Sequence, residues 1–215
     1  MKMIPVLLAM ALLAGCAGSK ITSRWISPGW EAKPQQRVLV ASLINPSNPR
    51  WDDKIEAHIV GDLKAAGIMA VSAYKLFGPD AFTGKDGNTI ETRLKDSGYT
   101  AVITIVLLDK KSEQVYVAPI EPNRGAETGV PFDRYIRSVT DRILSPGYYT
   151  QSTEYYWETH YYLHPGGKMV YSVQSKTFDP GSAEEMAHKY GMLIVKDMLK
   201  HKVVQKQSPA PVKEE

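Results

Sequence analysis

The sequence predicts a single α/β domain built on a mixed sheet of about five strands. In the first half of the chain, short apolar runs alternate with segments of helical periodicity, which is typical of parallel strands joined by crossover helices. In the second half, two strand-like segments flank a short Gly-containing turn, which predicts an antiparallel meander. With these strands numbered along the chain, we expect the order 2-1-3-4-5 and helices packed on the faces of the sheet.

The first half follows a β-α-β-α-β pattern. Residues 37–44, with the sequence RVLVASLI, are almost continuously apolar, as in a central parallel strand. The next helix begins near Trp51 and places apolar side chains on one face, at Ile55, Ile59 and Leu63. Residues 68–74 and 100–108 are the second and third predicted strands. Between them, a capping pair and a closing glycine predict a short helix over residues 88–98.

A less regular segment follows the third strand. Alternation over residues 113–118 suits a strand, and the Pro, Gly and Asn content of residues 119–131 predicts a loop. Apolar residues at helical spacing predict a short helix over residues 132–143, although the β-branched content there also suits a strand.

The fourth and fifth strands form a hairpin. A tyrosine-rich strand covers residues 148–163, turns at residues 164–168 and returns as residues 169–178. Alternation divides the side chains of the longer strand between two faces. The face that we expect in the core carries Tyr155, Trp157, Thr159, Tyr161 and Leu163. The opposite face carries Glu154, Tyr156, Glu158, His160 and Tyr162. A final helix begins after a capping pair at Ser182 and Glu185.

The N-terminal segment has the pattern of a secretory signal. A short apolar run behind Lys2 ends in the stretch Leu13–Cys16, which predicts a signal peptide over residues 1–15 that is cleaved before Cys16. The run is about half as long as a membrane-spanning helix requires, which argues against a spanning anchor. The other alternative is an ordinary signal peptide with an incidental cysteine, although Cys16 is the only cysteine of the chain.

This N-terminus sets the expected division of the chain. We expect residues 16–24 to form a lipidated N-terminus and tether, residues 25–204 to form the α/β domain, and residues 205–215 to form a disordered tail. Trp25 and Trp30 lie in a segment that we expect to run across the domain, pinned by its indole rings.

Six blocks of the sequence carry a resemblance to known proteins: residues 13–16, 21–25, 37–44, 148–149, 155–156 and 172–178. Together they resemble a family of bacterial lipoproteins of unknown function, and residues 13–16 resemble the lipobox of such proteins. The resemblance implies an α/β domain similar to the N-terminal domain of TolB and to the periplasmic part of CsgG. It also implies that Cys16 carries lipid. Because Ala17 and not aspartate follows, it implies the periplasmic face of the outer membrane of a Gram-negative bacterium.

Composition and motifs restrict the possible chemistry. The formal net charge is +3 and the basic residues form no long stripe, so we expect no nucleic-acid partner. The sequence has no Gly-rich phosphate loop and no hydrolase or zinc-protease motif. The best chemical constellation is Glu154, Glu158 and His160, which could hold a divalent ion or transfer a proton. The alternative is a solvated sheet face, on which a glutamate pairs with Lys176 of the facing strand.

Two further sets of residues are candidates for binding. In parallel α/β sheets, ligands bind beyond the carboxyl ends of the strands, and this edge carries Asn45, Ser47, Asn48 and Asp109. Tyrosines outside the core are common in binding surfaces, and the candidates here are Tyr148, Tyr149, Tyr156 and Tyr162.

These observations predict a non-enzymatic lipoprotein, without a cofactor or a bound metal. We expect it to hang from the membrane by the lipid on Cys16 and to act as a protein-interaction or assembly accessory factor of the cell envelope, with an envelope protein as its partner. The alternative is a periplasmic binding module for a small envelope ligand, such as a lipid or glycan fragment.

Overall fold

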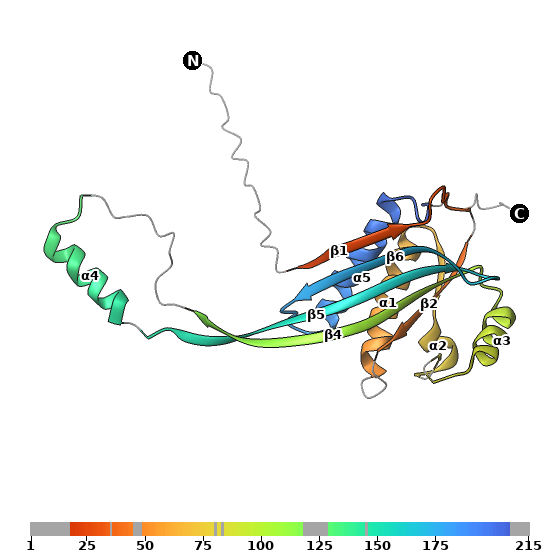
Figure 1. The fold of residues 1–215 in the computed structure, drawn as a ribbon, viewed down its shortest axis with the longest axis horizontal. Coiled ribbons are helices and arrows are strands. Elements are labelled where there is room, and N and C mark those ends of the chain that lie inside the picture. Colours follow the sequence, from red (N-terminus) through yellow and green to blue (C-terminus); the bar gives the residue numbers. More distant parts are fainter. Residues whose placement is uncertain are drawn as a thin grey trace, which may run out of the picture.

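The computed structural model describes residues 18–34, 36–44, 49–79, 81–82, 84–117, 129–144 and 146–206. Within these ranges, six strands form one mixed sheet in the order β1-β6-β5-β4-β2-β3 (Figure 1). The strands are β1 (Ser19–Ile26), β2 (Arg37–Leu43), β3 (Met69–Ser72), β4 (Ala101–Val117), β5 (Tyr148–Leu163) and β6 (Lys168–Phe178). The helices are α1 (Pro49–Ala65), α2 (Ala73–Phe77), α3 (Gly87–Ser97), α4 (Phe132–Leu144) and α5 (Ala183–Lys200).

The mixed α/β sheet is confirmed, but the expected number of strands is wrong. The five predicted strands lie in the expected order, as β3-β2-β4-β5-β6. Strand β2 is parallel to β3 and β4, and β4, β5 and β6 are antiparallel neighbours. The sixth strand, β1, pairs antiparallel with β6 and covers most of the segment expected to be a tether, residues 16–24. β1 is an edge strand and its side chains are mostly polar. Because this segment lacks the apolar pattern of a buried strand, the sequence did not indicate a strand there.

Two other predicted strands have different limits in the structure. The strand expected over residues 68–74 ends at Ser72, because the hydroxyl of Ser72 accepts a hydrogen bond from the backbone N–H of Lys75 and begins helix α2. The strand expected over residues 100–108 instead continues to Val117, because the long strand β5 pairs with it throughout. The alternating segment at residues 113–118 is therefore mostly the end of β4.

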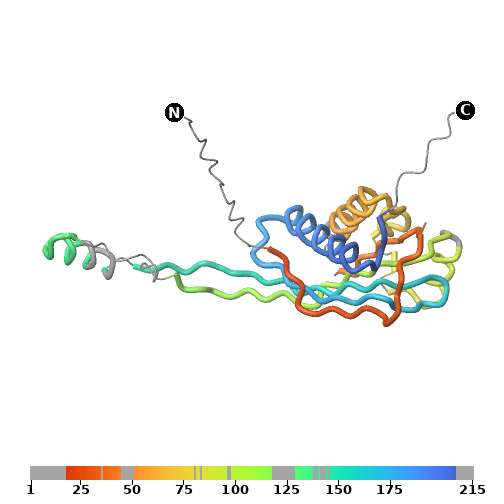
Figure 2. The backbone as a smooth tube through the Cα atoms, turned by 90° about the horizontal axis from the view of Figure 1, so that it is seen from above, coloured from red at the N-terminus to blue at the C-terminus, as the bar shows by residue number. Residues whose placement is uncertain are grey.

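The main core lies between one face of the sheet and helices α1 and α5. Figure 2 shows both helices on the same side of the sheet. Their buried side chains include Ile55, Ile59 and Leu63 of α1 and Tyr190 and Ile194 of α5. The predicted core face of β5 packs beneath them, with Trp157 and Tyr161 fully buried. Gly191 brings the two helices close together, since a Cβ atom there would lie 3.3 Å from Cβ of His58.

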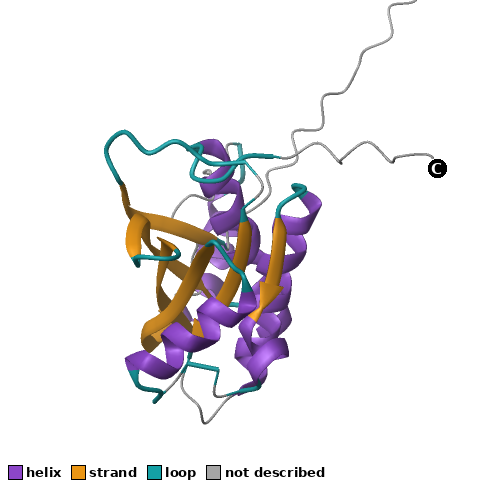
Figure 3. Ribbon diagram, turned by 90° about the vertical axis from the view of Figure 1, so that its right-hand side faces the viewer, coloured by secondary structure: helices purple, strands orange, loops and turns teal. Residues whose placement is uncertain are grey.

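The opposite face of the sheet is only partly covered. Helices α2 and α3 pack over β2, β3 and the start of β4, where a small cluster forms around Leu39, Ala41 and Val102. Figure 3 looks along the long axis and shows helices on both sides of the sheet. Beyond this cluster, β4, β5, β6 and β1 carry polar and aromatic side chains with no described helix over them. We call this part of the sheet the open face.

A buried carboxylate joins the elements of the first half. Glu56 of α1 is 1 % exposed and accepts hydrogen bonds from the backbone N–H groups of Ser42 and Tyr74, both at 2.8 Å. It also accepts from the hydroxyl of Ser72 at 2.6 Å. Its neighbour Asp52 accepts from the hydroxyl of Ser42 at 2.5 Å. Burial raises the pKa of both carboxyls, although these hydrogen bonds lower it in part.

A second polar contact fastens the N-terminal strand to the core. The guanidinium of Arg24 in β1 binds both carboxylate oxygens of Asp197 in α5, with Nε to Oδ2 at 2.8 Å. Asp197 is buried, and the hydroxyl of Tyr171 donates a further hydrogen bond to it at 2.9 Å. Trp30 is pinned as expected, because its indole N–H donates to the carbonyl of Val203. Trp25 instead lies on the open face and is 44 % exposed.

We predict that Glu56→Gln lowers the free energy of unfolding by about 3 kcal/mol, because the amide NH₂ would face hydrogen-bond donors in a buried site. Urea unfolding followed by circular dichroism measures this, and Glu31→Gln on the exposed loop is the matched control. The raised pKa means that the folded state binds the Glu56 proton more tightly than the unfolded state. Wild-type stability should therefore gain a contribution as the pH falls from neutrality towards the ordinary carboxyl range. Glu56→Gln should lack this contribution, and an equal pH dependence in both proteins would contradict the prediction.

Candidate functional site

The open face carries a polar network along β5. The hydroxyl of Tyr162 lies 3.0 Å from Nδ1 of His160, and Nε2 of the same ring lies 3.5 Å from Oε1 of Glu158. The amide of Gln174 in β6 donates to the other oxygen of Glu158 at 3.2 Å. Partial burial, and to a lesser degree the nearby Glu158, raise the pKa of Tyr162. These side chains share one face because residues of a strand alternate between two faces.

A second cluster on the open face surrounds Glu154. The hydroxyl of Tyr156 donates to Oε2 of Glu154 at 2.6 Å, and Nζ of Lys176 lies 3.3 Å from the same oxygen. The ammonium of Lys176 also donates to the hydroxyl of Tyr156 at 3.1 Å. The hydrogen bond from Tyr156, and then the contact with Lys176, lower the pKa of Glu154. The pairing of a glutamate with Lys176 on the facing strand, predicted as the alternative to a chemical site, is thus present in the structure.

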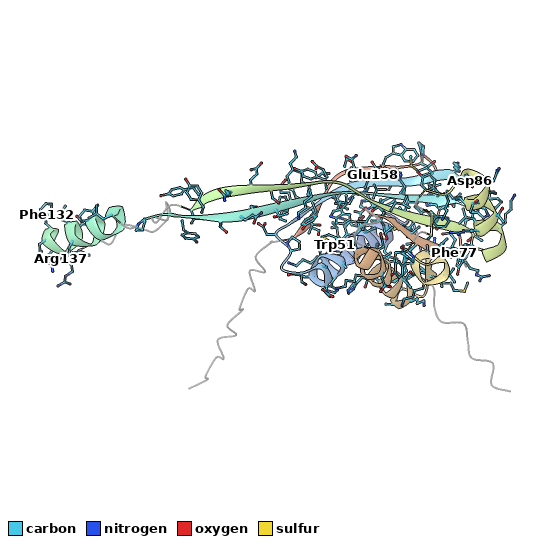
Figure 4. All side chains as sticks on the ribbon, turned by 90° about the horizontal axis from the view of Figure 1, so that it is seen from below. Trp51, Phe77, Asp86, Phe132, Arg137 and Glu158 are labelled. Atoms are coloured by element: carbon cyan, nitrogen blue, oxygen red, sulfur yellow. The ribbon has the colours of Figure 1, made fainter. Side chains whose placement is uncertain are left out.

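The geometry does not favour a metal site at Glu154, Glu158 and His160. All three lie on the open face, as the alternation of β5 predicts (Figure 4 labels Glu158). Glu154 and Glu158 are separated by about 13 Å along the strand, which is too far for one ion. Glu154 is already held by Lys176, and Glu158 by Gln174. In the part of the chain that the structure describes, no group of three His, Cys, Asp or Glu side chains is placed to hold a metal ion.

A cavity of about 230 Å³ opens on the same face, next to the polar network. Its walls are mainly apolar and include Leu43, Phe82, Leu94, Val102, Thr104 and Tyr162. It lies over β2 and β4. Helix α1, which connects β2 to β3, packs on one face of the sheet, and helices α2 and α3, which connect β3 to β4, pack on the other face. The boundary between β2 and β4 is therefore a topological switch point. The turn residues His164 and Gly167, beside the start of β4, also line the cavity, so it does not lie beyond the carboxyl ends of the strands, where ligands bind in open α/β sheets. This cavity could not be predicted from the sequence, because Phe82 and Leu94 become neighbours of Tyr162 only through the fold.

The most prominent exposed feature is an arm that leaves one end of the body (Figure 1). Strands β2 and β6 pair with β4 and β5 only as far as Val106 and Glu154. Beyond them, residues 112–117 and 148–153 pair only with each other, from Ser112–Thr153 to Val117–Tyr148. Helix α4 lies at the far end. We call this ribbon and α4 together the arm.

The arm exposes apolar side chains that the body leaves uncovered. On one side of α4, Phe132 is 79 % exposed and Ile136 is 44 % exposed. The charged residues Asp133, Arg134 and Arg137 follow the opposite side of the helix, so α4 is strongly amphipathic. Figure 4 labels Phe132 and Arg137 at this end of the molecule. On the ribbon, Tyr149 is 69 % exposed, and its ring lies 5.2 Å from that of Tyr116, centroid to centroid.

The structure divides the four candidate tyrosines between two places. Tyr148 and Tyr149 lie on the arm and are exposed. Tyr156 and Tyr162 lie on the open face of the body, where both are half-buried and hydrogen-bonded to neighbouring side chains. They do not form one continuous surface. A role for any of them in binding stays a prediction.

The other predicted site residues are only partly visible. Cys16 and the ligand-edge residues Asn45, Ser47 and Asn48 lie outside the described residues. Asp109 was expected at the end of a strand, but β4 continues past it and the residue pairs with Tyr156 at the base of the arm. Among the described residues, none of the helices has the length and apolar character that a membrane-spanning segment needs.

Comparison with known proteins gives similarities of shape only. No protein-family model and no curated protein sequence matches the chain. Among solved structures, it is similar to the PelC dodecamer from Paraburkholderia phytofirmans, with 12% identity and a TM-score of 0.46 over 88% of this chain and 99% of that one. It is also similar to the lipoprotein GNA1162 from Neisseria meningitidis, with 13% identity and a TM-score of 0.41 over 77% of this chain and 99% of that one. Likenesses of this size carry no information on function.

We predict that the purified chain melts at the same temperature with and without a metal chelator, and that His160→Ala changes the free energy of unfolding by less than about 1 kcal/mol. Differential scanning calorimetry and elemental analysis measure these quantities. Stoichiometric zinc in the purified protein, together with a lower melting temperature in chelator, would contradict this account of the open face.

Proposed function

We propose that this chain is a lipid-anchored accessory protein of the bacterial envelope, exposed to the periplasm from the outer membrane, which docks an envelope protein through its arm. It performs this role by binding and not by catalysis. The lipid on Cys16 holds it at the membrane. The observation that carries the proposal is the exposed apolar surface of the arm, at Phe132, Ile136 and Tyr149.

Without a partner, an arm of this kind leaves apolar surface in contact with water. A two-stranded ribbon on its own is only marginally stable in water, and an amphipathic helix gains its stability mainly by burying its apolar face. Contiguous exposed apolar side chains on a protein surface mark interaction sites. In the described structure, the body covers neither α4 nor the ribbon. A partner that covers the apolar side of α4 would supply the missing burial.

The anchor supports the same function. A protein confined to a membrane meets its membrane-bound partners at high effective concentration, so a contact of modest area is sufficient. The arm displays aromatic residues, which supply large contact area at little cost in side-chain entropy.

We predict that Phe132→Asp combined with Ile136→Asp abolishes the capture of a partner by in-membrane crosslinking of the native lipoprotein, because two carboxylates would be buried in the contact. Mass spectrometry identifies the partner. Asp133→Asn combined with Arg137→Gln is the matched control on the polar side of α4, and it should reduce capture only slightly. Cys16→Ser should also lose the partner.

Equal capture by the wild type and the Phe132→Asp, Ile136→Asp variant would remove the arm from the proposal. If no partner is captured while the chain stays in the outer membrane, the docking function itself fails.

The cavity under α3 favours one alternative function, the binding of a small envelope lipid. Its mainly apolar walls suit a single acyl chain. We predict that native mass spectrometry of the protein extracted from membranes shows a bound lipid in this case. Leu94→Trp should then lose the added mass, because the larger ring fills the cavity. An unliganded spectrum for both proteins would leave docking as the function.

A further inference from the structure

Strand β4 has a free edge along the arm. Its neighbour β2 pairs with it only as far as Val106, whereas β5 pairs with its other side as far as Val117. Residues 112–117 therefore have β5 on one side and, among the strands that the structure describes, none on the other. The pairing with β5 is regular here, because the register shift between the two strands lies nearer the body, between Leu107 and Asp109.

Hydrogen bonds just after β6 show which backbone groups face this edge. The N–H of Thr153 donates to a carboxylate oxygen of Asp179, and its C=O accepts from the N–H of Asp179 at 2.9 Å. Because Asp179 follows β6, both groups of Thr153 point away from β4. In an antiparallel pair this direction alternates along each strand, and residues directly opposite one another are alike in pointing toward or away from the other strand. The residues of the arm whose N–H and C=O point to the free edge of β4 are therefore Ser112, Gln114 and Tyr116.

The sequence does not protect this edge. Natural sheets block a free edge with proline, lysine, a bulge or a covering element. Residues 112–117, with the sequence SEQVYV, contain no proline, glycine or lysine, and Glu113 is their only charge. In the part of the chain that the structure describes, no other segment forms a backbone hydrogen bond with the edge-facing groups. A two-stranded ribbon is stabilised by further strands, so this edge is a template for one.

The same edge of a second copy fits this template. When two identical strands pair antiparallel about Gln114, each Gln114 lies opposite the other. Ser112 of each copy then lies opposite Tyr116 of the other copy. All three edge-facing residues are paired in this register, and each pair exchanges two backbone hydrogen bonds.

The side chains also favour this register. Glu113 lies opposite Val115 of the second copy, and Lys111 lies opposite Val117, so no charge opposes a like charge. Pairing about Glu113 would instead oppose two carboxylates. Pairing about Ser112 would bring the second copy onto the irregular stretch of β4 next to the body.

We propose that two copies of this chain associate through the free edges of β4, so that their arms form one four-stranded sheet with a two-fold axis at Gln114. The strand order across the pair is β5-β4-β4-β5, and each ribbon supplies the strands that the other lacks. The two bodies lie at opposite ends of the joined sheet, because the two β4 strands are antiparallel. This inference goes beyond the proposed function, since the pairing uses the ribbon and not α4.

Cysteine crosslinking of the chain in its membranes tests the pairing. With copper phenanthroline as the oxidant, Gln114→Cys should give a disulfide-linked dimer on a non-reducing gel. The reason is that paired residues lie about 5.5 Å apart between Cα atoms, which a disulfide spans.

The matched control is Gln151→Cys. Gln151 lies directly opposite Gln114 in the ribbon and is also exposed, but its backbone faces the other edge. We expect roughly tenfold more dimer from Gln114→Cys than from this control. The wild type reports any dimer that forms through Cys16, and equal membrane levels of the two variants verify that both fold.

A mixed pair tests the register. Two differently tagged copies, one with Ser112→Cys and the other with Tyr116→Cys, should crosslink to each other. Either variant alone should not form a dimer, because its two cysteines would lie about 13 Å apart along the strands.

No dimer from Gln114→Cys, or as much dimer from Gln151→Cys, would overturn the proposal. A disulfide between Gln114→Cys and a different protein would assign the edge to a strand of that protein, and would overturn it as well. Adding Phe132→Asp and Ile136→Asp to Gln114→Cys separates the two functions, because these changes should abolish partner capture by α4 and leave the dimer intact. Partner capture without a dimer removes only the strand pairing, and a dimer without partner capture removes only the docking function.

Discussion

The first half of this fold depends on one buried carboxylate. Glu56 joins helix α1 to the ends of β2 and β3 and to the start of α2, because Ser42, Ser72 and Tyr74 all direct donors at it. Hydrogen bonds to a buried charge are strong, and the same charge is costly when a partner is lost. These contacts fix where β2 and β3 end, and therefore where the chain turns into α1 and α2. The cavity and the switch point lie on the sheet that this contact aligns.

Much of the architecture could be predicted because burial leaves a clear pattern in the sequence. The continuous apolar run of β2 and the alternation of β5 predict a buried parallel strand and a strand with one core face, and both have these roles. Strand β1 could not be predicted in this way. It is an edge strand whose pairing uses the backbone, and its decisive side chain, Arg24, meets Asp197 only through a contact 173 residues away in the sequence. Glu56 left a weaker signal, since it lies among the apolar positions of α1.

The candidate surfaces also differ in how far they could be predicted from the sequence. The pairing of Glu154 with Lys176 could be predicted from strand alternation, because it needs only the register of one hairpin. The arm could not be predicted in this way. The sequence indicates two strands and an amphipathic helix, but it does not indicate that they extend beyond the other strands of the sheet. The cavity required the fold, because five separate segments of the chain line it. Local pattern therefore predicted most of the elements, while the surfaces that they form together needed the structure.

The position of β1 also decides how a mechanical load enters the domain. If the proposed anchor on Cys16 is pulled along the strand axis, the force acts on β1, which runs antiparallel to β6 with its side chain Arg24 held by α5. The backbone bonds between the two strands then share the load at the same time and are not opened one after another. The buried ion pair with Asp197 passes part of it directly to the last helix. Under such a pull, the paired strand β1 would resist shear, whereas a flexible linker would only transmit it.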